Sequence, residues 1–347
     1  MKLLNASSFG CTGFYLEDGV EEKNRFEYNL GSGVWGIANN AAGVVDFTDR
    51  CCGDSSQNGI QITTNSYVHI PADSAACSFY NTNPNNEYYG NSASGGFCGF
   101  SFVRLAYPIG SNKNLAEYSN FSPQNRPLKQ FYGNTAHSSS SRWYEAGCIY
   151  SGGNLYYKSD SDKNNEILTY RVGRSRESSF GFPLGRNTNI DGTPSWMTFE
   201  HTKTFMCQKG LQHWGNYADI KYFESHDSQR GATTFGESSM SHAILNMKTS
   251  NPTDNRPRDH QLFQFYDISV KTILAHVNFR NIQEADCVPS WVKDEDPNYH
   301  NYALVSLTHS DYFKPQGISA TTDISFTNSD NRLRIGHYVR PTGASRQ

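Results

Sequence analysis

The chain has 347 residues, a net charge of −3 and a pI near 6.4, without any cluster of Lys or Arg. This charge argues against a nucleic-acid binder, which normally carries a basic patch. Aromatic residues reach 14% of the chain, whereas disordered chains have few of them. The composition therefore predicts a folded protein whose core is filled by Phe and Tyr, residues that favour β-strands.

Short segments with period-two alternation recur along the chain, whereas apolar stripes of helical period do not. The strands expected in the first half are 60–64, 67–70, 100–103, 148–150, 155–157 and 168–172. Those expected in the second half are 196–199, 262–265, 268–270, 277–279, 324–326 and 333–335. Ser-Gly-Gly-Asn at 151–154 predicts a hairpin turn, and the best helix candidate is 282–286. Many short strands indicate an all-β fold, here expected to be an antiparallel β-sandwich (jelly roll).

Three long segments carry little strand pattern and are expected to be loops, namely 81–96, 107–146 and 224–260. The predicted β-sandwich domain spans 1–290 with these loop insertions. Residues 291–347 are expected to form a C-terminal β extension or arm. No internal repeat of fixed period is visible in the sequence.

Eight cysteines accompany an N-terminus that lacks the apolar segment of a signal peptide. No C-x-x-C spacing occurs, so neither a zinc ribbon nor a thioredoxin-type site is indicated. The thiols are either reduced and buried, or some pair after a cytoplasmic product reaches an oxidising exterior. A virus particle released by lysis fits the second interpretation. No apolar run has the length of about 20 residues that a membrane helix needs, so membrane insertion is not expected.

Catalytic motifs of serine hydrolases, P-loop proteins, dinucleotide-binding enzymes and zinc proteases are absent. The closely spaced carboxylates that jelly-roll glycosidases use are absent too, although a pair could still converge from distant strands. The chain is therefore expected to be non-enzymatic and to need no cofactor. One weak candidate for Ca²⁺ binding is the set of alternating oxygen ligands Asp160, Asp162 and Asn164. A polar tip between two strands explains this segment equally well.

Aromatic side chains beside polar residues are candidates for carbohydrate binding, because a ring stacks on a sugar while amides bond its hydroxyls. The candidates are Trp143, Tyr144, Trp214, Asn216 and Tyr217. Core or interface packing is the alternative for each tryptophan. Two N-glycosylation sequons, Asn5-Ala6-Ser7 and Asn120-Phe121-Ser122, carry meaning only if the chain follows a secretory route.

Asn-Gly-Ile-Gln-Ile at 58–62, followed by Tyr-Val-His-Ile-Pro at 67–71, resembles the opening of laminin-G-like, concanavalin-A-like jelly rolls. Later segments are similar to further strands of that family, namely Phe-Ser-Phe at 100–102, Trp-Met-Thr-Phe at 196–199 and Ile-Ser-Val at 268–270. The resemblance covers about residues 26–290. It departs from the family because the valine-rich continuation after Trp196 is absent and the intervening loops are long.

This resemblance implies a carbohydrate-binding or adhesive module of the kind found in bacteriophage tail fibres. The expected function is that of a virion structural or adhesion protein in a phage tail or fibre. Its expected partners are other virion proteins, copies of itself and a host surface glycan, and its expected location is the virion. The alternatives are a capsid decoration protein and, from another class, a polysaccharide-degrading glycoside hydrolase on the same fold.

Overall fold

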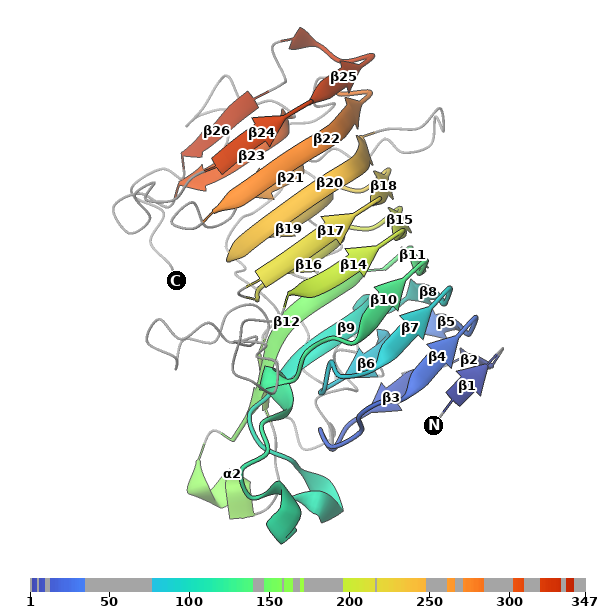
Figure 1. The fold of residues 1–347 in the computed structure, drawn as a ribbon, viewed down its shortest axis with the longest axis vertical. Coiled ribbons are helices and arrows are strands. Elements are labelled where there is room, and N and C mark those ends of the chain that lie inside the picture. Colours follow the sequence, from blue (N-terminus) through green and yellow to red (C-terminus); the bar gives the residue numbers. More distant parts are fainter. Residues whose placement is uncertain are drawn as a thin grey trace.

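The computed structural model describes residues 2–4, 6–9, 13–34, 77–139, 147–157, 159–164, 169–171, 196–215, 217–247, 261–265, 271–283, 302–308, 319–331 and 335–339. In this part of the chain, every strand pairing except one is parallel. Figure 1 shows the strands stacked in chain order, from the blue N-terminal end to the red C-terminal end. The backbone therefore winds repeatedly around one axis as a parallel β-helix, in which each turn is a rung.

Each rung contributes strands to three faces. Face 1 consists of β1 (Lys2–Leu4), β4 (Arg25–Glu27), β7 (Glu87–Tyr89), β10 (Gln130–Tyr132), β14 (Met197–Glu200), β17 (Tyr217–Lys221) and β24 (Ser319–Thr322). Face 2 consists of β2 (Ser7–Phe9), β5 (Leu30–Val34), β8 (Ser92–Gly95), β11 (Thr135–His137), β15 (Lys203–Phe205), β18 (Glu224–His226) and β25 (Ser325–Thr327). Two long strands run through both faces and join them into one sheet, namely β20 (Glu237–Asn246) and β22 (Thr272–Arg280).

Face 3 forms the second sheet. Its strands are β3 (Phe14–Leu16), β6 (Cys77–Asn81), β9 (Cys98–Leu105), β12 (Ile149–Tyr156), β16 (Lys209–His213), β19 (Arg230–Thr234), β21 (Gln261–Phe265), β23 (Tyr302–Thr308) and β26 (Ile335–Val339). All five residues are buried in β6, β16, β19 and β21. Face 3 is therefore buried on its outer side as well as its inner side along these strands, whereas faces 1 and 2 alternate between more and less buried residues.

Aromatic rings fill the interior, as the composition predicts. On face 1, Phe26 stacks on Tyr88 with ring centroids 5.2 Å apart, and Phe131 and Phe199 lie 5.4 Å apart farther along. Phe79 and Phe100 stack at 4.5 Å on face 3. Because parallel strands are in register, equivalent side chains of neighbouring rungs lie directly over one another.

A ladder of buried asparagines closes the corner between faces 1 and 2 in the N-terminal half. The Asn91 side chain accepts from the backbone N–H of Asn29 at 3.0 Å and donates to the Phe26 carbonyl at 3.0 Å. Asn134 repeats this arrangement one rung later, where its Oδ1 accepts from the Asn91 backbone N–H at 2.9 Å. These amides satisfy backbone groups that would otherwise be buried without partners.

The expected antiparallel jelly-roll sandwich is wrong, because the sheets are parallel. The predicted hairpin at 151–154 is wrong for a related reason: these residues lie inside β12, which runs without a turn from Ile149 to Tyr156. The segments expected to be loops contain strands, with β7 and β8 in 81–96, β10 and β11 in 107–146, and β18, β19 and β20 in 224–260. In the helix candidate 282–286, the described residues Ile282 and Gln283 are not helical.

Several predicted strands do exist, and they include 100–103 within β9, 196–199 overlapping β14, 262–265 within β21 and 277–279 within β22. The predicted strands 60–64, 67–70 and 268–270 lie outside the described residues. Strands on either side of the predicted domain boundary at residue 290 pair with each other, since β21 pairs with β23 and β22 pairs with β24 and β25.

The described part of the chain contains a disulfide and, elsewhere, two buried cysteines that face each other on neighbouring strands. Cys148 and Cys207 form a disulfide across a sequence separation of 59 residues. Cys77 and Cys98 lie opposite each other on β6 and β9, where burial raises the pKa of the Cys98 thiol. The remaining cysteines lie outside the described residues. Among the helices in the described part, none is long and apolar enough to cross a membrane.

Candidate functional site

One residue per rung occupies the corner between faces 1 and 2, and it adopts a left-handed backbone conformation. The corner positions are Tyr28, Gly90, Gly133, His201, Tyr222, His242, His276 and Asp323, with φ between 50° and 68°. This conformation is uncommon for residues other than glycine. Backbone hydrogen bonds to the next rung hold it, for example from His201 N–H to the Lys221 carbonyl and from Tyr222 N–H to the Ser241 carbonyl, both at 3.0 Å.

The rings at this corner stack along the axis of the β-helix. His201 lies between Tyr132 and Tyr222, with centroid separations of 4.8 and 4.4 Å. His242 continues the stack at 5.1 Å from Tyr222, and His276 lies 4.7 Å beyond it. We call these five residues the corner ladder. Tyr222 remains 45% exposed and Tyr132 41%, so the ladder is a surface feature rather than part of the core.

The ladder ends at a polar contact: Nδ1 of His276 lies 3.4 Å from Oδ2 of Asp323 on the next rung. At the other end, two glycines interrupt the row of side chains. A Cβ at Gly90 would meet the ring of Tyr28 at 2.5 Å, whereas a Cβ at Gly133 would have no neighbour closer than 3.8 Å. The corner therefore has an open position at Gly133, next to the ladder.

Two lysines flank the centre of the ladder, one on each face. Lys221 on face 1 pairs with Asp219 at 2.7 Å, and this hydrogen bond raises the pKa of Lys221. Lys203 on face 2 pairs with Glu224 at 3.1 Å. Partial burial of Glu224 opposes ionisation, but hydrogen bonds from Lys203 and His226 outweigh it and lower the pKa of this carboxyl group. Both lysines remain substantially exposed, so they offer cationic groups beside the rings.

Polar side chains on face 2 are linked in a chain that starts at Glu224. Its Oε2 lies 3.3 Å from Nε2 of His226, whose Nδ1 lies 3.2 Å from the Asn246 amide. Asn281 donates to Asn246, and Asn328 donates to Asn281, both at 2.8 Å. Both ring nitrogens of His226 are therefore occupied, which fixes the ring and leaves it poorly placed for proton transfer to a ligand.

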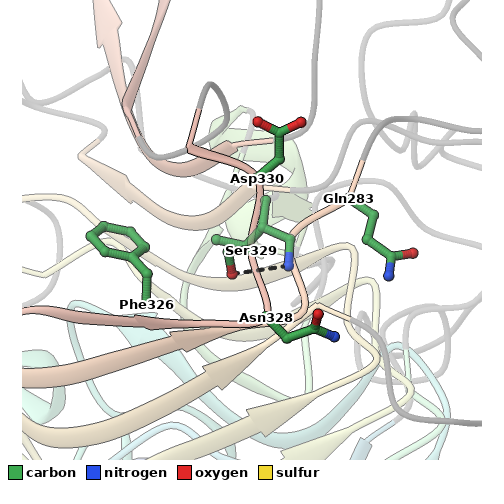
Figure 2. A pocket seen from close by; sticks show the side chains of 6 residues that line it. Gln283, Phe326, Asn328, Ser329 and Asp330 are labelled. Carbon is green, nitrogen blue, oxygen red and sulfur yellow. Dashed lines mark hydrogen bonds between the residues drawn. The ribbon is translucent and has the colours of Figure 1, made fainter.

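A pocket of about 500 Å³ opens at the C-terminal rung, and its lining residues are Ile282, Gln283, Phe326, Asn328, Ser329 and Asp330. Figure 2 shows Phe326 and Gln283 pointing to opposite sides, with Asp330 pointing away from the strands. The Ile282 backbone N–H donates to Ser329 Oγ at 3.3 Å. Phe326 stacks on the buried Phe279 at 5.6 Å, so its ring closes the core at this end.

None of the residues that the sequence suggests for carbohydrate binding belongs to the corner ladder. Trp214 is only 5% exposed and packs 5.8 Å from Phe235, so its ring has little surface for a ligand. Tyr217 is half-buried and lies 5.4 Å from Trp196, a partly exposed ring that the sequence did not single out for sugar binding. Trp143, Tyr144 and Asn216 lie outside the described residues. A carbohydrate-binding role for Tyr217 stays a prediction.

The candidate calcium ligands lie in a short helix, α2 (Asp160–Asn164), between β12 and β13 (Thr169–Arg171). These two strands pair antiparallel, so the segment is the tip between two strands, as the alternative interpretation predicts. Asp160 and Asn164 are exposed. Nowhere in the described part do three or more His, Cys, Asp or Glu residues come together in a way that could hold a metal ion.

Comparison with known proteins shows similarities that the sequence motifs did not reveal. Residues 8–143 match the family model described as CEMIP beta-helix. A G8 domain-containing protein of Dictyostelium discoideum is 42% identical over 334 residues, which cover 96% of this chain and 22% of that protein. Communication mutant protein F of the same organism is 38% identical over 340 residues, covering 96% of this chain and 28% of that protein.

The human cell migration-inducing and hyaluronan-binding protein is 34% identical over 146 residues, which cover 40% of this chain and 10% of that protein. The chain therefore spans only 22% and 28% of the length of these two Dictyostelium relatives, and its match covers a smaller part of the human one.

These relatives overturn the expectations drawn from the jelly-roll resemblance. The chain is not similar to a laminin-G-like phage domain, and nothing supports a virion structural or adhesion function, virion partners or a location in a virion. The short strand motifs that suggested this family occur in many β proteins, and those that lie in the described part are rungs of a parallel helix. The similarity of this chain is to eukaryotic G8 domain-containing proteins and to proteins of the CEMIP type.

Proposed function

We propose that this chain is an extracellular glycan-binding β-helix and that an extended glycan lies along the corner ladder. The observation that carries the proposal is the row of stacked surface rings from Tyr132 to His276. The name of the human relative, a hyaluronan-binding protein, supports a glycan as the ligand. The Cys148–Cys207 disulfide supports an extracellular location, since disulfides are rare in reducing compartments.

Ring edges, rather than ring faces, point outward from a stack of this kind. The edge of an aromatic ring carries partial positive charge, and Tyr and His add hydrogen-bonding groups there. Sugar oxygens, including carboxylates, suit such a surface. Lys203 and Lys221 add cationic groups on either side of the ladder.

The ladder is also preorganised. The inner rings are held on both sides by their neighbours, and the backbone is fixed by hydrogen bonds to the next rung. A ligand therefore meets side chains that have already lost much of their rotamer freedom, which lowers the entropic cost of binding. An extended polymer that follows the axis can contact several rungs at once, so modest contributions add up.

The test is the double substitution of His201 and Tyr222 by Ala, with binding to hyaluronan oligosaccharides and to a neutral glucan measured by titration calorimetry. Met206→Ala is a matched control, because Met206 has φ of 57° and 43% exposure but lies at the other corner of face 2. We expect at least a tenfold weaker affinity for the double variant and an unchanged affinity for the control.

Equal binding by the double variant and the wild type would reject the ladder as the site. Failure of the wild type to bind any of the glycans would reject the proposed function as a whole. Release of reducing ends from a glycan by the pure protein would show that it cleaves rather than only binds its ligand, and would overturn the proposed function.

A further inference from the structure

A loop of the β-helix carries an N-glycosylation sequon on an exposed turn. The loop leaves face 3 after β9 and returns to face 1 at β10, and it contains the short helices η1 (Gly110–Asn112), η2 (Ala116–Tyr118) and η3 (Pro123–Asn125). Asn120 is exposed on the turn between η2 and η3 and begins the sequence Asn120-Phe121-Ser122. We propose that Asn120 carries an N-linked glycan.

The residues after Asn120 are tied back to the body of the protein. The Phe121 backbone N–H donates to the Tyr118 carbonyl at 3.0 Å, and the two rings meet edge to face at 5.5 Å. The Arg126 guanidinium lies 5.1 Å over the Phe121 ring and pairs with Glu22 of the N-terminal region. Phe121 is therefore anchored to the protein body, while the neighbouring Asn120 stays exposed on the turn.

The disulfide between Cys148 and Cys207, which supports the extracellular location proposed above, also indicates an oxidising folding compartment. In eukaryotes that compartment also transfers glycans to Asn-x-Ser sequons. The inference therefore rests on the extracellular part of the proposed function. In the transfer, Nδ2 of Asn120 bonds to C1 of the first sugar of a lipid-pyrophosphate-linked oligosaccharide. The bond from C1 to the pyrophosphate breaks, and the amide loses one proton.

The position of the loop keeps such a glycan away from the corner ladder. The loop joins faces 3 and 1, whereas the ladder lies at the corner between faces 1 and 2. In Figure 1 the teal segment between β9 and β10 extends beyond the stacked strands, on the same side as α2.

The test is site-resolved glycopeptide mass spectrometry of the full chain, secreted by eukaryotic cells behind a cleavable signal sequence. We expect a glycan on the Asn120 peptide, its loss in Ser122→Ala, and its retention in Ser122→Thr, which keeps the sequon. Asn114, an exposed residue of the same loop outside any sequon, is the internal control and is expected to be unmodified.

A secreted chain whose Asn120 peptide is unmodified would overturn the inference. Glycan binding by the same preparation shows that it is folded and tests the proposed function separately. Because Asn5 lies far from Asn120 in the sequence, digestion places the two sites on separate peptides, and modification of Asn5 does not count in favour of Asn120.

Discussion

His213 shows how burial in the β-helix couples stability to pH. Its side chain is buried beside the ring of Phe199, and neither ring nitrogen has a hydrogen-bond partner among the described residues. Burial lowers its pKa from 6.5 to about 3. The folded chain therefore keeps this ring neutral, while the unfolded chain takes up a proton below pH 6.5. The unfolded state binds more protons between pH 6.5 and pH 3, so the free energy of unfolding falls as the pH falls through this window.

We therefore expect His213→Gln to reduce the acid sensitivity of the fold. Between pH 7 and pH 5 the wild type should lose about 2 kcal/mol of unfolding free energy through this histidine, and the variant should not. Urea unfolding at the two pH values measures both differences. An identical loss in the two proteins would show that His213 does not couple folding to protons.

Asn91 is central to the buried asparagine ladder. Its Oδ1 accepts from the backbone and side chain of Asn29, and its Nδ2 donates to Phe26 and Asn134. Asn91→Ala leaves several buried polar groups without partners, so we expect a loss of about 3 kcal/mol or more. Asn278→Ala is the control, because the Asn278 side chain donates to Ser325 Oγ and Thr327 Oγ1 through exposed hydrogen bonds, and its cost should stay below about 1 kcal/mol. Chemical unfolding of both variants measures the loss of unfolding free energy in each.

At the scale of elements, the sequence predicts many strands but not their direction. Phe100 and Phe102 mark the core side of β9 as expected. The many short strands and the resemblance to jelly rolls predict an antiparallel sandwich. Alternation fits that expectation, because antiparallel sheets usually have one solvated face and parallel sheets usually have none. In this β-helix, faces 1 and 2 are parallel and yet partly exposed on one side, so the usual association fails.

Gly152 and Gly153 are a second case in which the local sequence predicts the wrong structure. A Gly-Gly pair between apolar residues is typical of a hairpin turn. Here the register of β12 shifts between Ser151 and Asn154, and a Cβ at Gly152 would meet the Trp214 ring at 2.6 Å. The glycines therefore mark an irregularity in the strand and a close approach of a buried ring, which local sequence cannot distinguish from a turn.

Gly90 and Gly133, which occupy the corner positions before the ladder, allow a test by substitution. Gly133 has φ of 68° and open space where a Cβ would lie, and His is already accepted at a similar conformation in the later rungs. We expect Gly133→His to fold and to extend the surface of the ladder, strengthening glycan binding by a factor of about 3 or more, because one more ring edge contributes a contact. Both variants carry the strain of a left-handed backbone, and Gly90→His should be the more destabilising of the two, because its Cβ must also displace the Tyr28 ring. Thermal unfolding measures the stability of both variants, and binding titrations measure their affinity for the glycan. Weaker binding by a folded Gly133→His would contradict an extended binding surface at this corner.

At the scale of the whole molecule, irregular rung lengths concealed the repeat. Equivalent residues are 62 positions apart from Asn29 to Asn91 and 43 from Asn91 to Asn134, but 20 from Asp219 to Ser239. No fixed period exists for a sequence scan to find. For this reason the sequence did not predict the stacked rings of the corner ladder. His201, Tyr222 and His242 are the exception, because they lie in compact rungs whose spacing of about 20 residues could have been recognised.

The length of the ladder predicts how binding depends on the length of the ligand. From Tyr132 to His276 the ladder crosses four strand spacings of about 4.8 Å each, or about 19 Å in total. If each rung contributes a separate contact, affinity should rise with oligosaccharide length until the ligand spans this distance and then level off. Titration with a graded series of oligosaccharides measures the plateau. The His276→Ala variant should reach its plateau at a shorter ligand, because the last ring is missing, while a plateau at a single sugar would show that the glycan occupies one local pocket and not the row of rings.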